Sequence, residues 1–495
     1  MMTQDISRGL YSVAQVRELD RRAMASGIAG YPLMQRAAAA CWRALQERWP
    51  EARRIHVFCG SGNNGGDGFE IARLALSAGR TVRVSQVGKV PESGDALTAL
   101  TAWQAAGGQV DSFSSARISD ADVIVDAIFG IGLSRDVAGV AREAIYAINV
   151  AHETGTGVLA VDVPSGLDAD RGCAMAAQIH ADLTVTLIAD KPGLHAGNPG
   201  VGQVLLADLD IPQALREGLQ APLQSLHETD LKQWLPARPV NAHKGSNGHV
   251  LLVGGNHGMA GAILLAARAA LRAGTGLVSV ATRQQHATAL TAVQPELMCH
   301  GVEQVEELLP LLQRVDAIAI GPGLGQDDWS RKIYAAVMQC DKPRVMDADA
   351  LNLLANEPVH HAQWVLTPHP GEAARLLACS TAAIQQDRFG AVSRLQGRYG
   401  GVVVLKGAGS LIQGAVRRLC PYGNPGMAVG GMGDVLTGII AAFIAQGLSP
   451  EDAANAGVLA HALAGDRAAK AGQRGLLPGD AIGELRSIVN PVVTP

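Results

Sequence analysis

The sequence predicts an α/β protein of two domains, each built on a largely parallel sheet covered by helices. Three observations lead to this prediction. The chain has 495 residues, more than one hydrophobic core normally serves. Hydrophobic residues make up 48% of it and charged residues only 17%, a balance that supports large cores. Short Val/Ile/Leu runs alternate with helical patterns almost throughout, which is typical of helices covering a parallel sheet.

The first half of the chain contains four apolar runs that read as strands buried on both faces. They are "IHVFC" (55–59), "DVIVDAIFG" (122–130), "VLAVDVP" (158–164) and "LTVTLI" (183–188). Between them, residues 70–78 and 140–154 have the spacing of amphipathic helices. The pattern predicts a Rossmann-like sandwich of helices around a parallel sheet.

A second series of predicted strands covers residues 249–255, 277–282, 316–323, 344–349, 364–371 and 401–407, with helices at 261–273 and 434–446. The intervening stretch loses the strand pattern and gains proline and polar residues, so we place the boundary near residues 220–230. The predicted domains are residues 1–222 and 228–495. They share strand–glycine loop–helix units but no common period, so they are not copies of each other.

Composition and charge exclude several classes of function. The net charge is −4 and there is no Lys/Arg run, so binding to nucleic acid or anionic membranes is disfavoured. No uncharged apolar run reaches the ~18 residues of a membrane span, and the first residues lack a signal pattern. The seven cysteines show no CxxC spacing and are expected to be free thiols. We expect a cytoplasmic protein that neither spans a membrane nor binds nucleic acid.

The stretch "GSGNNGGDGF" (60–69) follows the first strand and contains GxGxxG at Gly60, Gly62 and Gly65. A glycine loop between a strand and a helix aims backbone N–H groups at the sheet edge, where they favour a phosphate. A nicotinamide cofactor site would also need an acidic residue about 20 positions later. The next strand, "TVRVSQVG", instead places Ser85 and Gln86 there. An ordinary dehydrogenase is therefore disfavoured.

Polar side chains follow three predicted strands of the first domain. Asn64 and Asp67 follow the first strand, Asp126 and Asp162 lie toward the ends of the second and third, and Ser165 follows the third. The ends of parallel strands lie side by side, so these groups can converge, and oxygen ligands suit a hard cation rather than zinc. The alternative is that each is only a helix cap or a turn residue.

Three ordered motifs in this half, "GNNGGDG", "DAIFGIGLSRDV" and "VDVPSGLDAD", resemble the epimerase domain of the NAD(P)H-hydrate repair enzymes. The resemblance covers roughly residues 10–215. It implies that Asn64, Asp126 and Ser165 hold a potassium ion and that Asp162 lies at the hydrated ring. It also implies that two loops bind the damaged nucleotide: Asn63, Asn64, Gly65, Gly66, Asp67, Gly130, Ile131, Gly132, Leu133, Ser134, Arg135 and Asp136.

Inverting a carbon that bears a hydroxyl beside an enamine needs protonation, loss of water and its re-addition. We expect that one positioned carboxylate acting as both acid and base could serve for this. Asp162 is our candidate catalytic residue in the first domain.

In the second domain, "NPGMAVGGMGDVLTGIIAAF" places Gly430, Gly431 and Gly433 directly before Asp434 at the start of a strongly apolar helix. The main-chain N–H groups of such a loop and the helix dipole form an anion site. Asp434 would then stand beside a phosphate and exchange a proton with a substrate hydroxyl. A simple capping role for Asp434 is the alternative.

Two other strand ends carry candidates. "VVVLKGAGSLI" places Lys406 before small residues, where it fits a nucleotide phosphate, although an ordinary surface lysine fits the pattern too. "VLTPHPGEAARLL" places His369 between two prolines, as a substrate contact or a structural loop residue. No ligand spacing for zinc, Walker A motif or serine nucleophile elbow is present.

Residues 228–492 resemble the ribokinase-like superfamily and, within it, the nicotinamide-nucleotide-hydrate dehydratases. The motifs are "HKGSNGHVLLVGG", "GPGLG", "MDADALNLL", "TPHPGE", "KGAGS" and "GGMGDVLTG". The resemblance implies that Asp434 reaches the substrate hydroxyl and that Ala262, Gly323 and His369 contact the hydrated nucleotide. It implies binding of ADP, with Mg²⁺ held through phosphates and water, by residues 424–433 and 406–410, among them Lys406, Gly407, Ala408, Gly409, Ser410, Gly430, Gly431 and Gly433.

Together the two resemblances predict a bifunctional enzyme that interconverts the R and S hydrates of NADH and NADPH and dehydrates the S form with ADP. It would use K⁺ in the first domain and Mg²⁺ with ADP in the second, and we expect a homo-oligomer. One alternative is a ribokinase-like small-molecule kinase with a nucleotide-binding module. The other is an inactive scaffold, which the polar residues Asn64, Asp126 and Asp162 disfavour.

Overall fold

The computed structural model describes residues 8–115, 118 and 120–490, and the chain divides into two compact units between Leu223 and Gln224. The first unit holds a sheet in which all the strand pairs are parallel, in the order β4-β3-β2-β5-β6-β7-β8. The strand order reverses between β2 and β5, and ligands bind at such reversals outside the carboxyl ends of the strands. The bounds are β2 (Arg54–Cys59), β3 (Thr81–Gln86), β4 (Asp111–Ser112), β5 (Val123–Ala127), β6 (Gly157–Val161), β7 (Leu183–Leu187) and β8 (Gln203–Ala207).

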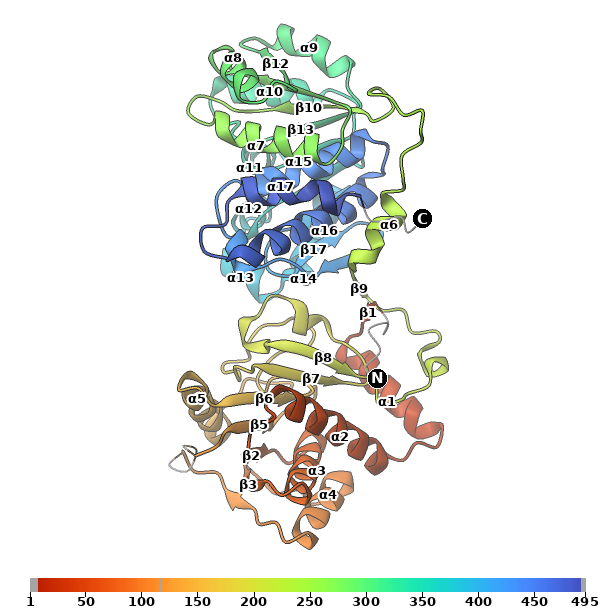
Figure 1. Cartoon of the computed structure of the whole chain (residues 1–495), viewed down its shortest axis with the longest axis vertical. Coiled ribbons are helices and arrows are strands. Elements are labelled where there is room, and N and C mark those ends of the chain that lie inside the picture. Colours follow the sequence, from red (N-terminus) through yellow and green to blue (C-terminus); the bar gives the residue numbers. More distant parts are fainter. Residues whose placement is uncertain (1–7, 116–117, 119, 491–495) are drawn as a thin grey trace. The chain divides into compact units, whose positions relative to one another are not determined.

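Helices cover both faces of this sheet (Figure 1). On one face, α2, α3 and α4 pack on Val57, Val125 and Leu159, while α5 packs on Ile124 and Val158 of the other face. The expected Rossmann-like sandwich is confirmed. The remaining bounds are β1 (Gly9–Leu10), α1 (Val13–Ala25), α2 (Gly30–Arg48), α3 (Asn63–Ser77), α4 (Gly94–Ala105) and α5 (Gly139–Glu153).

The asparagine- and glycine-rich segment is helix rather than loop, which corrects our expectation. Helix α3 begins at Asn63, seven residues before the predicted start at residue 70. A Cβ at Gly65 would lie 2.0 Å from the Gly60 carbonyl oxygen, and one at Gly68 would lie 2.6 Å from the Ala127 side chain. The glycines therefore let the first turns of α3 lie directly against the ends of β2 and β5.

The second unit also has a mainly parallel sheet, in the order β9-β18-β17-β16-β15-β14-β13-β10-β11-β12. Only β17 runs antiparallel to its neighbours β16 and β18 among the pairs within this unit. The bounds are β9 (Leu223–Ser225), β10 (His249–Val253), β11 (Leu277–Thr282), β12 (Met298–Gly301), β13 (Ala317–Ile320), β14 (Arg344–Met346), β15 (Trp364–Leu366), β16 (Val402–Leu405), β17 (Ser410–Gln413) and β18 (Arg417–Cys420).

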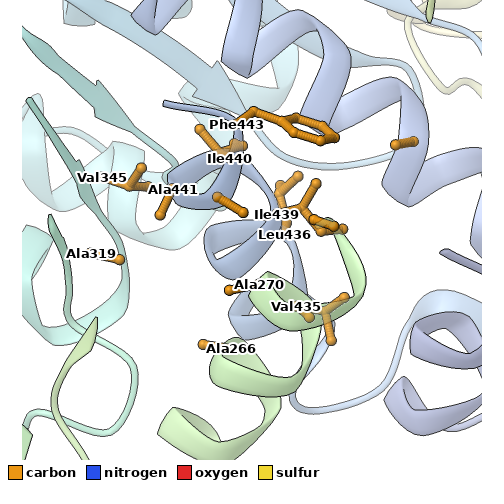
Figure 2. Packing of buried hydrophobic residues seen from close by; sticks show 14 of the residues in the cluster. Ala266, Ala270, Ala319, Val345, Val435, Leu436, Ile439, Ile440, Ala441 and Phe443 are labelled. Carbon is orange, nitrogen blue, oxygen red and sulfur yellow. The ribbon is translucent and has the colours of Figure 1, made fainter. Parts of the chain in front are cut away.

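Helix α15 is the centre of the second core. Its residues Val435, Leu436, Ile439, Ile440 and Phe443 are buried, and Figure 2 shows them gathered with alanines of α7. The helices of this unit are α6 (Leu231–Trp234), α7 (Ala260–Arg272), α8 (Gln284–Val293), α9 (Val305–Gln313), α10 (Asp328–Met338), α11 (Ala348–Asn356), α12 (Pro370–Leu376), α13 (Thr381–Gln386), α14 (Arg388–Tyr399), α15 (Met432–Ala445), α16 (Pro450–Ala468) and α17 (Pro478–Ile488).

The segment between the two predicted domains contains a strand. Residues 223–227, which we left outside both predicted domains, contain β9, and β9 pairs with β18.

In the described part of the chain, every helix is too short or too polar to cross a bilayer.

Candidate active sites

A cavity of about 700 Å³ opens at the carboxyl ends of the strands of the first unit. Asp162 borders it, together with most of the residues that we predicted to bind the nucleotide: Asn63, Asn64, Asp67, Gly130, Ile131, Gly132, Leu133, Ser134 and Arg135. The other three lie outside its lining. Gly65 and Gly66 lie inside α3, against the Gly60 backbone and Met34, and Asp136 is exposed.

Asp162 is held by a buried lysine that our sequence reasoning missed. The Lys191 ammonium group donates to Asp162 Oδ1 at 2.6 Å, and the backbone N–H of Leu187 donates to the same oxygen at 3.2 Å. Asp162 Oδ2 accepts only a long bond, 3.4 Å, from the Ile131 N–H at the cavity wall. The geometry leaves Oδ2 as the oxygen that faces the cavity. Asp162 also has a φ of 68°, a strained conformation that is common at functional sites.

Two of the three predicted potassium ligands, Asp126 and Ser165, are in direct contact. Ser165 Oγ donates to Asp126 Oδ1 at 2.6 Å, and both residues are fully buried. Asn64 lines the cavity, with Oδ1 3.1 Å from the position of a Cβ on Gly130, and its buried Nδ2 has no hydrogen-bond partner among the described residues. Burial raises the pKa of Asp126 to about 6. The carboxylate, hydroxyl and amide oxygens of these residues are ligands of the kind that a potassium ion takes, whereas the unpartnered N–H group of Asn64 suits an acceptor such as a phosphate oxygen.

In the second unit, Lys406 lies in a buried cluster of charges. Its ammonium group donates to Asp347 Oδ1 at 2.6 Å and lies 3.7 Å from Glu372 Oε2. Thr437 Oγ1 donates to the other oxygen of Asp347 at 2.8 Å. A Cβ on Gly433 would lie 3.2 Å from the Lys406 nitrogen, so the glycine leaves the cluster accessible from the start of α15. Lys406 is thus part of an ion-pair network, and its predicted contact with a phosphate remains a prediction.

Asp434 lies in the first turn of α15, as predicted, in a strongly acidic surrounding. Burial and the neighbouring Asp347 raise its pKa to about 7, while Lys406 opposes the rise. A carboxyl group with a pKa near neutrality can both accept and return a proton under ordinary conditions. Gly431, the residue before α15, has a φ of 96°, which turns the chain into the helix and leaves the helix N-terminus open.

The other predicted residues of this unit lie on neighbouring loops. A Cβ on Gly323 would lie 3.2 Å from the Ala262 side chain, so these two residues are adjacent. His369 caps α12 through Nδ1, which accepts from the Gly371 N–H at 2.9 Å, and its ring is more than half exposed. His369 therefore has a structural role in its loop, one of the two alternatives that the sequence left open, and its exposed ring remains available to a ligand.

The segment 406–410 is a turn with a buried arginine beneath it. Ser410 Oγ donates to the Gly407 carbonyl at 2.9 Å, and Arg388 donates to the Ala408 carbonyl. Gly407 and Gly409 have φ values of 140° and 63°, so their amides are free to turn toward a ligand. This small-residue turn, beside the open start of α15, is a cradle that suits the phosphates of a nucleotide.

Four functional candidates were missed from sequence: Lys191, Asp347, Glu372 and Arg388. Asp347 and Glu372 belong to the motifs "MDADALNLL" and "TPHPGE", so their carboxylates at strand ends were a usable signal. No motif contains Lys191 or Arg388, and the residues next to a lysine or arginine in the sequence do not show whether its side chain is buried.

Each of the two units contains a segment that matches the model of a known protein family. A family described as NAD(P)H-hydrate dehydratase matches residues 250–486, and one described as YjeF-related protein N-terminus matches residues 30–193. A ribokinase-like superfamily protein from Enterococcus faecalis has a solved structure that is 32% identical and has a TM-score of 0.51. The similarity covers 54% of this chain and 96% of that one, and it confirms the ribokinase-like fold of the second unit.

Curated relatives match over nearly the whole length. The bifunctional NAD(P)H-hydrate repair enzyme of Coxiella burnetii is 46% identical, over 97% of this chain and 99% of its own. The enzyme of the same name from Escherichia coli is 44% identical, over 99% of this chain and 94% of its own. The chain therefore belongs to the family of bifunctional NAD(P)H-hydrate repair enzymes.

Proposed function

We propose that this protein repairs hydrated NADH and NADPH in two steps on one chain. The first unit interconverts the R and S hydrates, and the second dehydrates the S hydrate to the intact cofactor with consumption of ADP. The observation that carries this proposal is the presence of two separate carboxylate centres. Asp162 borders a cavity in the first unit, and Asp434 lies at an open helix start in the second. The full-length relatives named for both activities support it.

In the first unit, the cavity would hold the hydrated nucleotide with its ring at Asp162. Oδ2 of Asp162 is the oxygen available for proton exchange with the substrate hydroxyl, because Oδ1 is occupied by Lys191 and Leu187. We assign Asn64, Asp126 and Ser165 to a potassium ion, which would supply positive charge beside the phosphates of the nucleotide. The support for this ion is the buried oxygens of Asp126 and Ser165 and the amide oxygen that Asn64 carries.

In the second unit, Asp434 would remove the proton of the substrate hydroxyl while the turn at 406–410 and the start of α15 hold the nucleotide phosphates. The hydroxyl oxygen then takes the terminal phosphoryl group of ADP, which converts a poor leaving group into phosphate and leaves AMP. The electron pair of the ring nitrogen expels that phosphate, and loss of a ring proton restores the reduced nicotinamide. Mg²⁺ would accompany ADP and neutralise the charge on its phosphates.

A small-molecule kinase is the second candidate, because the second unit has the ribokinase-like fold. The observation against it is that the similarity to repair enzymes includes the first unit and its polar residues. A kinase would accumulate a phosphorylated alcohol, whereas the repair enzyme would restore the absorbance of the reduced nicotinamide. Offering NADPH hydrate and candidate alcohols with ADP or ATP separates the two functions.

The proposal is tested by incubating the protein with mixed R and S hydrates and ADP, and by comparing two variants. Asp434→Ala is expected to abolish recovery of the cofactor while the epimers still equilibrate. Asp162→Ala is expected to stop equilibration while the S hydrate is still dehydrated. If neither variant separates the two steps, the assignment of one step to each unit is wrong.

We also propose that the enzyme is a cytoplasmic homo-oligomer that acts on small molecules alone. Sedimentation of the purified chain tests the oligomer, and fractionation of cells that produce it tests the location.

A further inference from the structure

Asp67 is a buried acid that borders the same cavity as Asp162. It lies at the fifth residue of α3, where the glycines bring the helix against the strand ends, and it is only 7% exposed. The two carboxyl groups reach the cavity from different elements, Asp67 from α3 and Asp162 from the turn that follows β6. Both are therefore available to one bound ring.

The carboxyl group of Asp67 makes no hydrogen bond to any residue in the described part of the chain. Its neighbour one turn later, Glu70, is equally buried but bonds to Tyr31 at 2.6 Å and Arg73 at 2.8 Å. No protein group among the described residues occupies the carboxyl oxygens of Asp67, and the residue lines the cavity. An acid in this position is open to a ligand that enters the cavity.

The surroundings of Asp67 favour its neutral form. Burial is the largest cause, and the charges of Asp162, Asp20 and Glu70 add to it, so its pKa lies well above its ordinary value. Five titratable groups interact electrostatically with Asp67. They are Asp20 of α1, Cys41 of α2, Cys59 of β2, Glu70 of α3 and Asp162 of the turn after β6. Asp162, by contrast, has an ammonium group at 2.6 Å. Asp162 has a cation as its partner and Asp67 has none within the described ranges of the chain, so the two acids can take different parts in a proton exchange.

We propose that Asp67 is a second catalytic residue of the epimerase, which exchanges a proton with the substrate oxygen on one face of the ring while Asp162 does so on the other. This inference rests on the proposed function. Inversion requires the hydroxyl to leave from one face and water to add to the opposite face. Two carboxyl groups on different elements can serve the two faces separately, so a pair of acids replaces the single acid–base residue that we expected from the sequence.

The proton balance follows from this arrangement. The Asp67 carboxyl gives its proton to the leaving hydroxyl, the C–O bond breaks with its electron pair on oxygen, and the lone pair of the ring nitrogen forms a C=N bond. Water then forms a new C–O bond from the other face, the C=N pair returns to nitrogen, and Asp162 takes the proton. One proton has passed from Asp67 to Asp162 and returns through solvent, and in the opposite direction the two roles exchange.

The test uses Asp67→Asn in the full-length protein. The amide has the shape of the neutral acid but cannot donate an acidic proton. We expect kcat for epimerisation to fall at least about a hundredfold, which is the contribution of one general acid, with KM changed less than about threefold. Incorporation of oxygen from isotopically labelled water into the hydrate should fall by the same factor. Dehydration of pure S hydrate, measured in the same sample, should be unchanged and is the internal control.

Because Asp67 has no hydrogen-bond partner to lose, the thermal unfolding of the first unit should be unchanged or occur at higher temperature. A lower unfolding temperature, a rise in KM alone, or epimerisation within about threefold of the unmodified protein would each overturn the inference. If the unmodified protein itself does not interconvert the epimers, the proposed function has failed instead. The two failures are therefore distinguishable.

Discussion

Lys191 shows how one side chain links the stability of the first unit to its chemistry. It is fully buried and donates to Asp162, Thr186 Oγ1 at 2.7 Å and two carbonyls at 3.0 Å. Its role is to fix Asp162 in a strained conformation with one oxygen toward the cavity. It is a positioning residue rather than a group that contacts the substrate.

Replacing Lys191 by methionine should leave a buried carboxylate without its partner, which costs about 3–5 kcal/mol. We expect the unfolding transition of the first unit to shift accordingly in calorimetry, and epimerisation to fall with it. Lys89→Met, at an exposed lysine, is the matched control and should change stability by less than about 0.5 kcal/mol. Equal stabilities of the two variants would contradict the role given to Lys191.

The raised pKa of Asp434 predicts how the rate of dehydration depends on pH. Its pKa is about 7, and as a base it must be deprotonated to act. The rate should therefore fall about tenfold per pH unit below pH 7 and level off above it. Asp434→Asn should lower the rate by about 10²–10⁴-fold at every pH. A profile that stays level down to pH about 5 would show that another group is the base.

At the residue scale, sequence reasoning identified groups at strand ends and helix starts better than the residues that pair with them. Asp162 and Asp434 follow strand ends or begin helices, which are positions that a motif reveals. The ion pairs Lys191–Asp162 and Lys406–Asp347 could not be assigned, because a buried ion pair forms only when distant segments pack together.

At the scale of elements, close packing of helices explains much of the glycine content. Helix α15 packs on α7 so tightly that a Cβ on Gly438 would lie 2.0 Å from the Ala266 carbonyl oxygen. The sequence predicted α15 and α7 within two residues of their ends, because their apolar periodicity is strong. It missed the start of α3, because the two asparagines and three glycines before Phe69 look like a loop until packing requires them in a helix.

Gly438→Ala tests this packing. The added methyl must push α15 away from α7, so we expect a loss of about 1–3 kcal/mol or more in the second unit. The control is Gly483→Ala in α17, where a Cβ would meet nothing within 4 Å. That change should stabilise the helix by about 0.5–1 kcal/mol. Chemical denaturation of both variants measures the difference, and a neutral Gly438→Ala would contradict the close approach.

At the scale of the whole molecule, the chain joins two α/β units with different sheets and different carboxylate centres. Fusion is useful because a dehydratase that accepts only the S hydrate would leave the R hydrate unrepaired. The two-domain class and the fold of each half were predictable, since strands and helices alternate regularly in both. The strand β9 was not, because its pairing with β18 joins residues almost two hundred positions apart and leaves no local pattern.

The most direct test of the account follows both hydrates and the recovered cofactor over time by chromatography, starting from a mixture of R and S hydrates with ADP. The unmodified protein should consume both hydrates completely, one molecule of ADP for each cofactor restored. Asp162→Ala should stop after the S hydrate is used, and Asp434→Ala should restore none. Complete consumption of the R hydrate by Asp162→Ala, or recovery of the cofactor by Asp434→Ala, would contradict the central claim that each unit carries one step.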